Sequence, residues 1–397
     1  MEKRNEYPII LIHGLVGWGK DDGIHSFFPY FGPLIKHLDA LGVEYYAPSL
    51  GPFNSAWDRV CVLWAYLFGG TVDYGKVHSE KYGHARYGKT YEHGVLEDLG
   101  KTEKHKKLIA FGHSFGGPVI RLMGTLFTYG SEEERAGTDP DDLSPLFAGG
   151  HGDLLHALTT LSGVNNGTAL ASMFGIRGMS LPTLAIHGLC GLLGNTPITK
   201  IFNGHLQQYG IMPEPEDVTG WHLPDWKALL KGLRVMDAAK GEDNVWREME
   251  IEVIQEELLP KEKVDPKAYY FAQRADATEI RHGRRTMTPT LKYAICYFPG
   301  LLTGTWSGPK VRPYGVGTDE AWQHCDGFVN IPGQTAPFNQ PQEEADWDTD
   351  FKPGIWYNMP IETGDHTLWN GFLVGGKVQC PLYDRMIALC RSLPDAE

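Results

Sequence analysis

Short uninterrupted apolar runs alternate with segments of helical periodicity along much of the chain. The runs are typical of strands that are buried on both faces of a parallel sheet. They comprise residues 9–12, 107–112, 154–161 and 268–272, with 44–47 as a shorter candidate. Helical spacing occurs in residues 31–41, 119–127 and 383–392. The alternation predicts an α/β fold, with a mostly parallel central sheet and helices on both of its faces.

The segment from about residue 165 to 255 differs in character from the sequence on either side of it. Residues 169–193 are apolar, rich in glycine and nearly uncharged, residues 214–225 are rich in proline and acidic residues, and residues 228–254 are amphipathic. We read this segment as a helical insertion in one α/β domain that spans residues 1–397. A repeat of 20 to 50 residues is absent from the sequence, which argues against solenoids and propellers.

Two further segments lack a clear period. Residues 69–91 are rich in Gly, His, Tyr and charge, and residues 300–351 are rich in Gly and Pro. Both are predicted to be long loops, and long loops in a compact enzyme are usually functional or anchored by a metal.

Composition and charge restrict the possible partners. The chain has 397 residues, of which 42% are hydrophobic, and a net charge of −13 from 36 basic and 49 acidic residues. That balance argues against nucleic acid and against a strongly anionic membrane, because both require clustered Lys and Arg. Residues 173–193 contain Arg177, Pro182 and His187, so we do not expect a transmembrane segment there.

The ends and the cysteines leave the compartment open. Residues 1–7 are polar and the apolar run after them is too short for a signal peptide, so the protein is either intracellular or begins at a mature N-terminus. The six scattered cysteines are compatible with one or two disulfides and equally with free thiols.

The pentapeptide from Gly112 to Gly116 has the form Gly-x-Ser-x-Gly, with Ser114 at its centre. Such spacing also arises by chance in a chain with 48 glycines. Here it follows a predicted buried strand and precedes a predicted helix, which is the context of a nucleophile elbow. Ser114 is therefore the candidate nucleophile.

A His-Gly-Leu sequence follows the first predicted strand. In α/β-hydrolases such a loop supplies one backbone N–H to the oxyanion hole, and the residue after the nucleophile supplies the other. The two donors here would be the N–H groups of Leu15 and Phe115. For His13 we favour a structural role in holding the loop over a catalytic one.

The acid and the base should follow the serine in the order Asp or Glu, then His. Asp326 lies in a Cys-Asp-Gly-Phe-Val turn, and His366 lies in a Gly-Asp-His-Thr turn 40 residues later (366−326). Each signal is weak by itself, because Asp-Gly turns are common and 16 histidines compete.

The chain resembles the secreted lipases of Bacillus, Geobacillus and staphylococci, often called family I.5, over nearly its whole length. The most specific similarity is the block Trp57-Asp58-Arg59, followed by Gly-Gly-Thr-Val-Asp-Tyr-Gly at 69–75, His78 and Gly-His-Ala-Arg-Tyr-Gly at 83–88. Supporting blocks lie at 8–18, 144–151, 326–330 and 354–356. The resemblance implies an α/β-hydrolase fold, a triacylglycerol lipase activity and a Ser114, Asp326 and His366 triad.

The same resemblance implies a structural zinc ion held by two Asp and two His. Asp58, His78 and His84 match three of the family's ligands, and Asp237 is the match for the fourth, although the sequence around it diverges. Four protein ligands close a tetrahedron and leave no position for water, so this zinc would be structural. The alternative is a solvated His- and Asp-rich loop without a metal.

Three departures from the family pattern affect what can be carried over. Leu368 stands where the family has a calcium-binding glutamate, so the usual Ca²⁺ site is expected to be absent. Residues 164–167 read Val-Asn-Asn-Gly in place of Pro-His-Asp-Gly. The family's lid corresponds to residues 169–193, which are much richer in glycine here. The candidate lid leucines are Leu181, Leu184, Leu189, Leu192 and Leu193.

The resulting prediction is a serine ester hydrolase that acts on a lipid or ester substrate at an interface and is secreted by family resemblance. A short-chain carboxylesterase or phospholipase with the same triad is the nearest alternative. A non-catalytic binding protein with the same fold is a more distant one. The oligomeric state is not indicated by the sequence.

Overall fold

A seven-stranded sheet lies at the centre of the computed structural model, which describes residues 4–236 and 242–396, without the side chains of 175–182. Its order is β10-β11-β7-β6-β5-β1-β2, and every neighbouring pair is parallel. The strands are β1 (Ile9–Ile12), β2 (Tyr45–Tyr46), β5 (Leu108–His113), β6 (Leu155–Leu161), β7 (Tyr269–Asp276), β10 (Gln342–Glu344) and β11 (Trp356–Thr363). All five predicted strands are confirmed, whereas β10 and β11 were not predicted.

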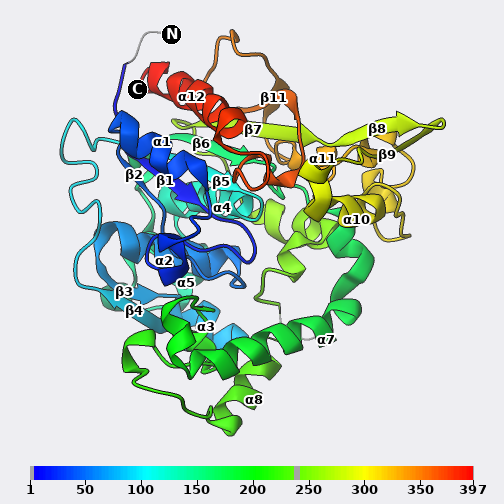
Figure 1. Ribbon diagram of the computed structural model, residues 1–397. Helices are drawn as coiled ribbons and strands as arrows, with labels where there is room; N and C mark the ends of the chain where they lie inside the picture. Colours follow the sequence, from blue (N-terminus) through cyan, green and yellow to red (C-terminus); the bar gives the residue numbers. More distant parts are fainter. Residues whose placement is uncertain (1–3, 237–241, 397) are drawn as a thin grey trace.

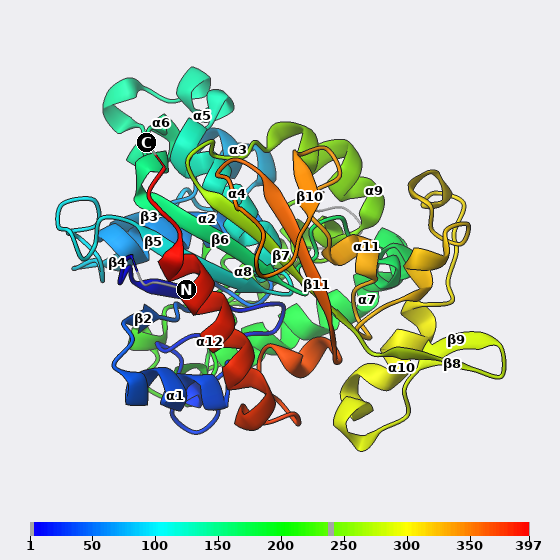
Figure 2. The ribbon, with the colours of Figure 1, turned by 90° about the horizontal axis from the view of Figure 1, so that it is seen from above.

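Helices cover both faces of this sheet, as Figure 2 shows. Alternate residues of β1 enter different cores: Ile10 and Ile12 pack with α2 (Ala56–Phe68) and α4 (Gly116–Tyr129), while Ile9 and Leu11 pack with α1 (Pro33–Leu41) and α12 (Gly376–Ser392). Successive side chains of a strand point to opposite faces, so an uninterrupted apolar run is what a sheet buried on both sides requires. The α/β class is confirmed.

The prediction of an irregular loop over residues 69–91 is wrong. The segment forms β3 (Gly70–Asp73), α3 (Lys76–Tyr82) and β4 (Tyr87–Tyr91), and β3 pairs antiparallel with β4. Two free N–H groups at the N-terminus of α3 find their hydrogen-bond acceptor in a side chain distant in sequence. The Glu134 carboxylate accepts from the N–H groups of Val77 and His78 at 3.1 and 2.7 Å. Apolar periodicity could not reveal a helix whose partners are polar and remote in sequence.

The chain between β6 and β7 is largely helical, as predicted for the insertion. Its longest helix, α7 (Ala169–Gly194), runs through Pro182 and several glycines, and it contacts α8 (Trp226–Val235). The segment ends with 3-10 turns and α9 (Ile251–Val253). Figure 1 shows α7 and α8 below the sheet. The assignment of residues 1–397 to one domain stays a prediction.

The remaining elements are short or peripheral. They are α5 (Glu132–Gly137), α6 (Pro145–Ala148), the hairpin β8 (Thr278–Arg281) and β9 (Arg284–Met287), α10 (Ala294–Thr303) and α11 (Ile331–Gln334). The hairpin extends away from the body of the molecule in both ribbon views (Figures 1 and 2). Helix α12 begins seven residues before the predicted start of the last helix (383−376).

Within the described residues, no helix has the length and apolarity needed to cross a bilayer. All six cysteines are free thiols.

Candidate active site and metal centre

Ser114 occupies the sharp turn between β5 and α4. Its φ of 59° lies in the left-handed region, which costs energy for a residue with a side chain and is common at active sites. The flanking glycines permit this turn. A Cβ on Gly112 would lie 2.3 Å from the Gly116 carbonyl oxygen, and one on Gly116 would lie 2.5 Å from that of Ile12. Close backbone approach therefore explains the spacing of the pentapeptide.

Asp326 and His366 are brought together by two hydrogen bonds. The Nδ1 atom of His366 lies 2.7 Å from Asp326 Oδ2, and the His366 backbone N–H donates to the Asp326 carbonyl oxygen at 2.8 Å. The second carboxylate oxygen accepts from the N–H groups of Phe328 and Val329. A carboxylate accepts only, so His366 Nδ1 carries the proton and Nε2 is free to act as a base.

Ser114 and His366 line the same cavity, which has a volume of about 820 Å³. Most of its other walls are apolar, and they include Leu15, Phe174, Trp246, Ile295 and Phe328. A large apolar cavity with a few convergent polar groups is the usual form of a site for a small organic substrate. This cavity suits an acyl chain or another apolar group beside Ser114.

The His13-Gly14-Leu15 loop lies against the serine turn. A Cβ on Gly14 would be 2.7 Å from Ser114 Cβ, and Leu15 lines the cavity. His13 Nδ1 lies 2.9 Å from the Gly14 carbonyl oxygen, and its Nε2 accepts from the Leu50 N–H at 3.1 Å. Burial, assisted by the nearby Arg59 charge, lowers the pKa of His13 to about 3. These contacts agree with a loop-holding role for His13.

The buried guanidinium of Arg59 contacts this loop, a role that was not predicted from the sequence. Its Nη1 contacts the carbonyl oxygens of His13 and Gly14 at 3.2 and 3.4 Å, and its Nη2 donates to that of Pro52 at 2.9 Å. The guanidinium also lies 4.8 Å from the centre of the Phe115 ring. The Gly14 carbonyl and the Leu15 N–H belong to one planar peptide group, so fixing the oxygen fixes the direction of the N–H.

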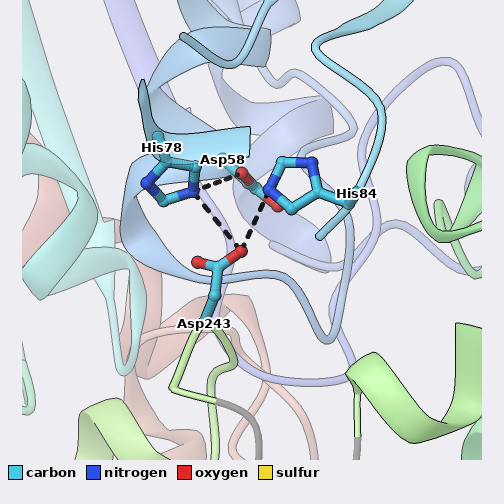
Figure 3. Close-up of side chains that lie close together, drawn as sticks. All are labelled: Asp58, His78, His84 and Asp243. Carbon is cyan, nitrogen blue, oxygen red and sulfur yellow. Dashed lines mark ion pairs between the residues drawn. The ribbon is translucent and has the colours of Figure 1, made fainter. Parts of the chain in front are cut away.

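A second cluster brings together Asp58, His78, His84 and Asp243, which could hold a metal ion (Figure 3). Each offers one ligand atom, and the four atoms lie within 4.8 Å of one another. Asp58 comes from α2, His78 from α3, His84 from the turn after α3, and Asp243 from the segment after α8.

The unpaired atoms of this cluster fit a metal. Asp58 Oδ1, His78 Nε2 and His84 Nε2 are buried without a hydrogen-bond partner. The His78 Nε2 atom lies 3.5 Å from Asp58 and 3.4 Å from Asp243, and His84 Nε2 lies 3.4 Å from Asp243. Unpaired buried polar atoms are costly, and a cation surrounded by them removes that cost.

Neighbouring groups fix the orientation of these side chains. His84 Nδ1 lies 2.8 Å from the Ala85 carbonyl oxygen, which places its proton there and leaves Nε2 as a lone-pair donor. Asp58 Oδ2 accepts from Gln208 Nε2 at 2.9 Å and from the Tyr209 hydroxyl at 2.8 Å. The Trp57 ring stacks on the His78 ring at 4.9 Å. Such contacts are typical of metal ligands in their binding orientation.

Among the described residues, the fourth member of this cluster is Asp243. Asp237 lies outside the described residues, and the carboxylate that joins the other three side chains is Asp243, six residues later. Both aspartates lie in the same insertion, and their sequence surroundings give no reason to choose between them.

The three departures from the family pattern have clear positions. Leu368 is buried in the core under α12 and brings no ligand oxygen in its side chain. In the Val-Asn-Asn-Gly sequence at 164–167, the side-chain amide of Asn166 donates to the carbonyl oxygens of Pro332, Thr335 and Ala336. The first turns of α7 line the cavity through Leu170, Ala171 and Phe174.

The candidate lid leucines are not all directed at the cavity. Leu189 and Leu192 are exposed to solvent, and Leu184 and Leu193 are half-buried. The side chain of Leu181 lies outside the described set. Lid motion stays a prediction.

The chain is similar to several curated proteins along most of its length. Lipase 1 of Staphylococcus aureus (strain NCTC 8325 / PS 47) is 29% identical over 366 residues, which is 90% of this chain. The lipase of Staphylococcus epidermidis is 29% identical over 373 residues. The chain spans about half the length of these curated relatives, 50% and 49%.

Solved structures give the same result. Staphylococcus hyicus lipase superposes with a TM-score of 0.80 at 24% identity, covering 98% of this chain and 97% of that one. EstA from Clostridium botulinum has a TM-score of 0.80 at 30% identity, with 100% and 90% covered. Lipase 1 from Pelosinus fermentans has a TM-score of 0.73 at 28% identity, with 98% and 100% covered. The predicted α/β-hydrolase fold is confirmed.

A family model settles the relationship. The model described as "Lipase-like, C-terminal domain" matches residues 5–374, and the predicted resemblance to staphylococcal lipases is thereby confirmed. The chain belongs to the family of lipase-like C-terminal domains.

Proposed function

We propose that this protein is a carboxylic ester hydrolase of the triacylglycerol lipase type, with Ser114 as its nucleophile. The observation that carries the proposal is the position of a serine in the left-handed turn of an elbow, on the wall of an apolar cavity shared with the Asp326-bound His366. The family relationship, with its named lipases, supports the same activity.

The proposed reaction is acyl transfer through Ser114. The Ser114 Oγ attacks the ester carbonyl carbon while His366 Nε2 takes the hydroxyl proton, and the developing oxyanion is stabilised by the Leu15 and Phe115 N–H groups. Collapse of the tetrahedral intermediate breaks the bond to the alcohol, which leaves with the proton returned by His366. Water then attacks the acyl-enzyme, His366 takes its proton, and the acid is released. Asp326 holds the imidazole tautomer and stabilises the imidazolium.

We infer that the metal bound by Asp58, His78, His84 and Asp243 is a structural Zn²⁺ ion. Two imidazole nitrogens and two carboxylate oxygens form a ligand set that zinc accepts, and four protein ligands leave no open position for catalysis. When bound, the metal supplies a crosslink between α2, the α3 region and the insertion.

Acylglycerols are the substrate class that we favour over short-chain esters. A cavity of about 820 Å³ with mostly apolar walls can hold a long acyl chain. We propose an open lid and a lipid interface as the working condition, with α7 as the moving element. A short-chain carboxylesterase or phospholipase uses the same three residues and is the alternative. Secretion and the absence of calcium stay predictions.

Two measurements test the function. A fluorophosphonate probe should label the wild-type protein at Ser114 and fail to label Ser114→Ala, which excludes a non-catalytic binding protein. A series of p-nitrophenyl esters and triacylglycerols from C2 to C18 then places the enzyme between esterase and lipase. Undiminished ester turnover by purified Ser114→Ala would remove Ser114 from the mechanism.

A further inference from the structure

The side chains of Tyr30 and His113 form a buried connection between three separate loops of the proposed active site. His113 precedes Ser114 in the elbow, and its ring lies between the Tyr30 hydroxyl and the main chain of His366. Tyr30 in turn contacts the backbone of Gly14, next to the proposed oxyanion donor Leu15. Three hydrogen bonds therefore join the nucleophile, the base and the oxyanion loop.

The direction of each hydrogen bond is fixed by the chemistry of its partners. The His366 carbonyl oxygen, 3.0 Å from His113 Nε2, can only accept, so Nε2 carries the proton. Burial and the nearby His366 ring hold the pKa of His113 well below its usual range, so the ring is neutral and Nδ1 is an acceptor. It accepts from the Tyr30 hydroxyl at 2.8 Å, and the Tyr30 oxygen accepts from the Gly14 N–H at 3.0 Å.

The surroundings leave these groups little freedom. The Tyr30 ring packs at 5.1 to 5.8 Å against the rings of Phe31, Trp18, His13 and His113. His113 is fully buried, and a Cβ on Gly14 would lie 2.9 Å from the Tyr30 hydroxyl. Tyr30 itself is half-buried and lines the cavity with His113, so loss of its hydroxyl leaves His113 Nδ1 and the Gly14 N–H without their protein partner.

We propose that Tyr30 is a positioning residue, which through His113 holds the His366 loop and through Gly14 holds the oxyanion loop in register with Ser114. The inference rests on the proposed function. Acyl transfer needs the base and the oxyanion donors to be placed to within a fraction of an ångström of the nucleophile, and small displacements are expensive in rate. The network supplies that placement without touching the ester carbonyl.

The Tyr30→Phe variant tests this proposal, because it removes one hydroxyl and keeps the ring that lines the cavity. Active-site titration with a fluorophosphonate should count nearly all of the protein as competent. The kcat per titrated site should fall about tenfold or more, while KM changes little. A purely structural role would lower the melting temperature and the titratable fraction but leave kcat per titrated site unchanged, and that result would overturn the proposal.

Tyr357→Phe is the matched control. Its hydroxyl is also an acceptor for a backbone N–H, that of Lys352 at 2.8 Å, but it lies on β11 away from the cavity-lining residues. Its removal should leave kcat per titrated site at the wild-type value. A fall equal to that of Tyr30→Phe would show that any such deletion has the same effect, which contradicts the proposal.

A double-mutant cycle tests the route through His113. In His113→Gln the amide takes the place of Nε2, which keeps a donor for the His366 carbonyl and removes the acceptor for Tyr30. In that background Tyr30→Phe should lower kcat per titrated site by a much smaller factor than it does in the wild type. If the two substitutions instead lower kcat independently, so that their effects on the activation free energy add, Tyr30 does not act through His113. Failure of the proposed function is distinguishable, since it would appear as a wild-type protein that the probe does not label.

Discussion

The Asp326 carboxylate lies 2.7 Å from Nδ1 of His366 and is completely buried. Two backbone N–H groups donate to its other oxygen, so the orientation of the carboxylate does not depend on the imidazole alone. In the proposed mechanism this pair defines which nitrogen of His366 faces the serine.

We expect Asp326→Asn to lower kcat by about 10³- to 10⁴-fold with little change in fold, because an amide can stabilise the wrong imidazole tautomer. Steady-state kinetics with a soluble ester and a circular dichroism melt measure the two quantities. Asp365→Asn is the control, since its Oδ1 accepts from the Thr367 N–H and hydroxyl, which an amide oxygen can still do. Equal losses in the two variants would remove Asp326 from its proposed role.

Asp243→Asn should abolish stoichiometric zinc binding, because it removes an anionic ligand from a four-residue site. Elemental analysis of protein purified without chelators should give about one zinc per wild-type chain. Asp237→Asn is the matched variant and should retain the metal. Retention of zinc by Asp243→Asn together with its loss from Asp237→Asn would restore the original prediction from sequence.

Arg59→Met should lower the free energy of unfolding by about 3 kcal/mol, because three buried carbonyl oxygens each lose a hydrogen bond from a charged donor. Denaturant unfolding measures the loss. Arg135→Met is the control, since Arg135 also donates to three carbonyl oxygens but is exposed, so water can replace it. A smaller loss for Arg59→Met than for Arg135→Met would show that burial is not the determining factor.

His187 on α7 should make the fold sensitive to acid. It is fully buried with both ring nitrogens unpaired, and burial lowers its pKa to about 4. Below pH 6.5 the native state then binds fewer protons than the unfolded chain. The contribution of His187 to the free energy of unfolding is therefore fully present above pH 6.5 and is lost as the pH falls toward 4. The difference in the pKa of His187 between the unfolded and native states corresponds to about 3 kcal/mol in the free energy of unfolding.

The measurement is the free energy of unfolding of the wild type and of His187→Phe between pH 4 and 8. Phenylalanine keeps an aromatic ring against Phe53, which lies 5.4 Å away, and cannot be protonated. The difference in the free energy of unfolding between the two proteins should be constant above pH 7. Below pH 6.5 it should shift in favour of the variant. Parallel curves over the whole range would show that His187 does not titrate as proposed.

The strands next to the active site could be predicted from the sequence, because a strand buried on both faces is apolar at most of its positions. The segment of residues 69–91 was not, since the N-terminus of α3 is capped by the distant Glu134 and β4 forms by antiparallel pairing with β3. Strand β11 was missed because it shows neither a continuous apolar run nor a strict alternation: Asn358 lies in its buried half, and Ile361 is exposed in its second half.

The sequence by itself determined the strand–turn–helix around Ser114, because two glycines and an apolar run impose it locally. It also determined the family, through blocks of residues that lie next to one another in the chain. Only the tertiary structure brought Asp243 beside His78 and His84. Only the tertiary structure, likewise, placed Arg59 against the carbonyl oxygen of Gly14 and Tyr30 against its N–H. Those relationships depend on how segments from α2, the insertion and the first loop meet in space, and sequence spacing carries no record of such distances.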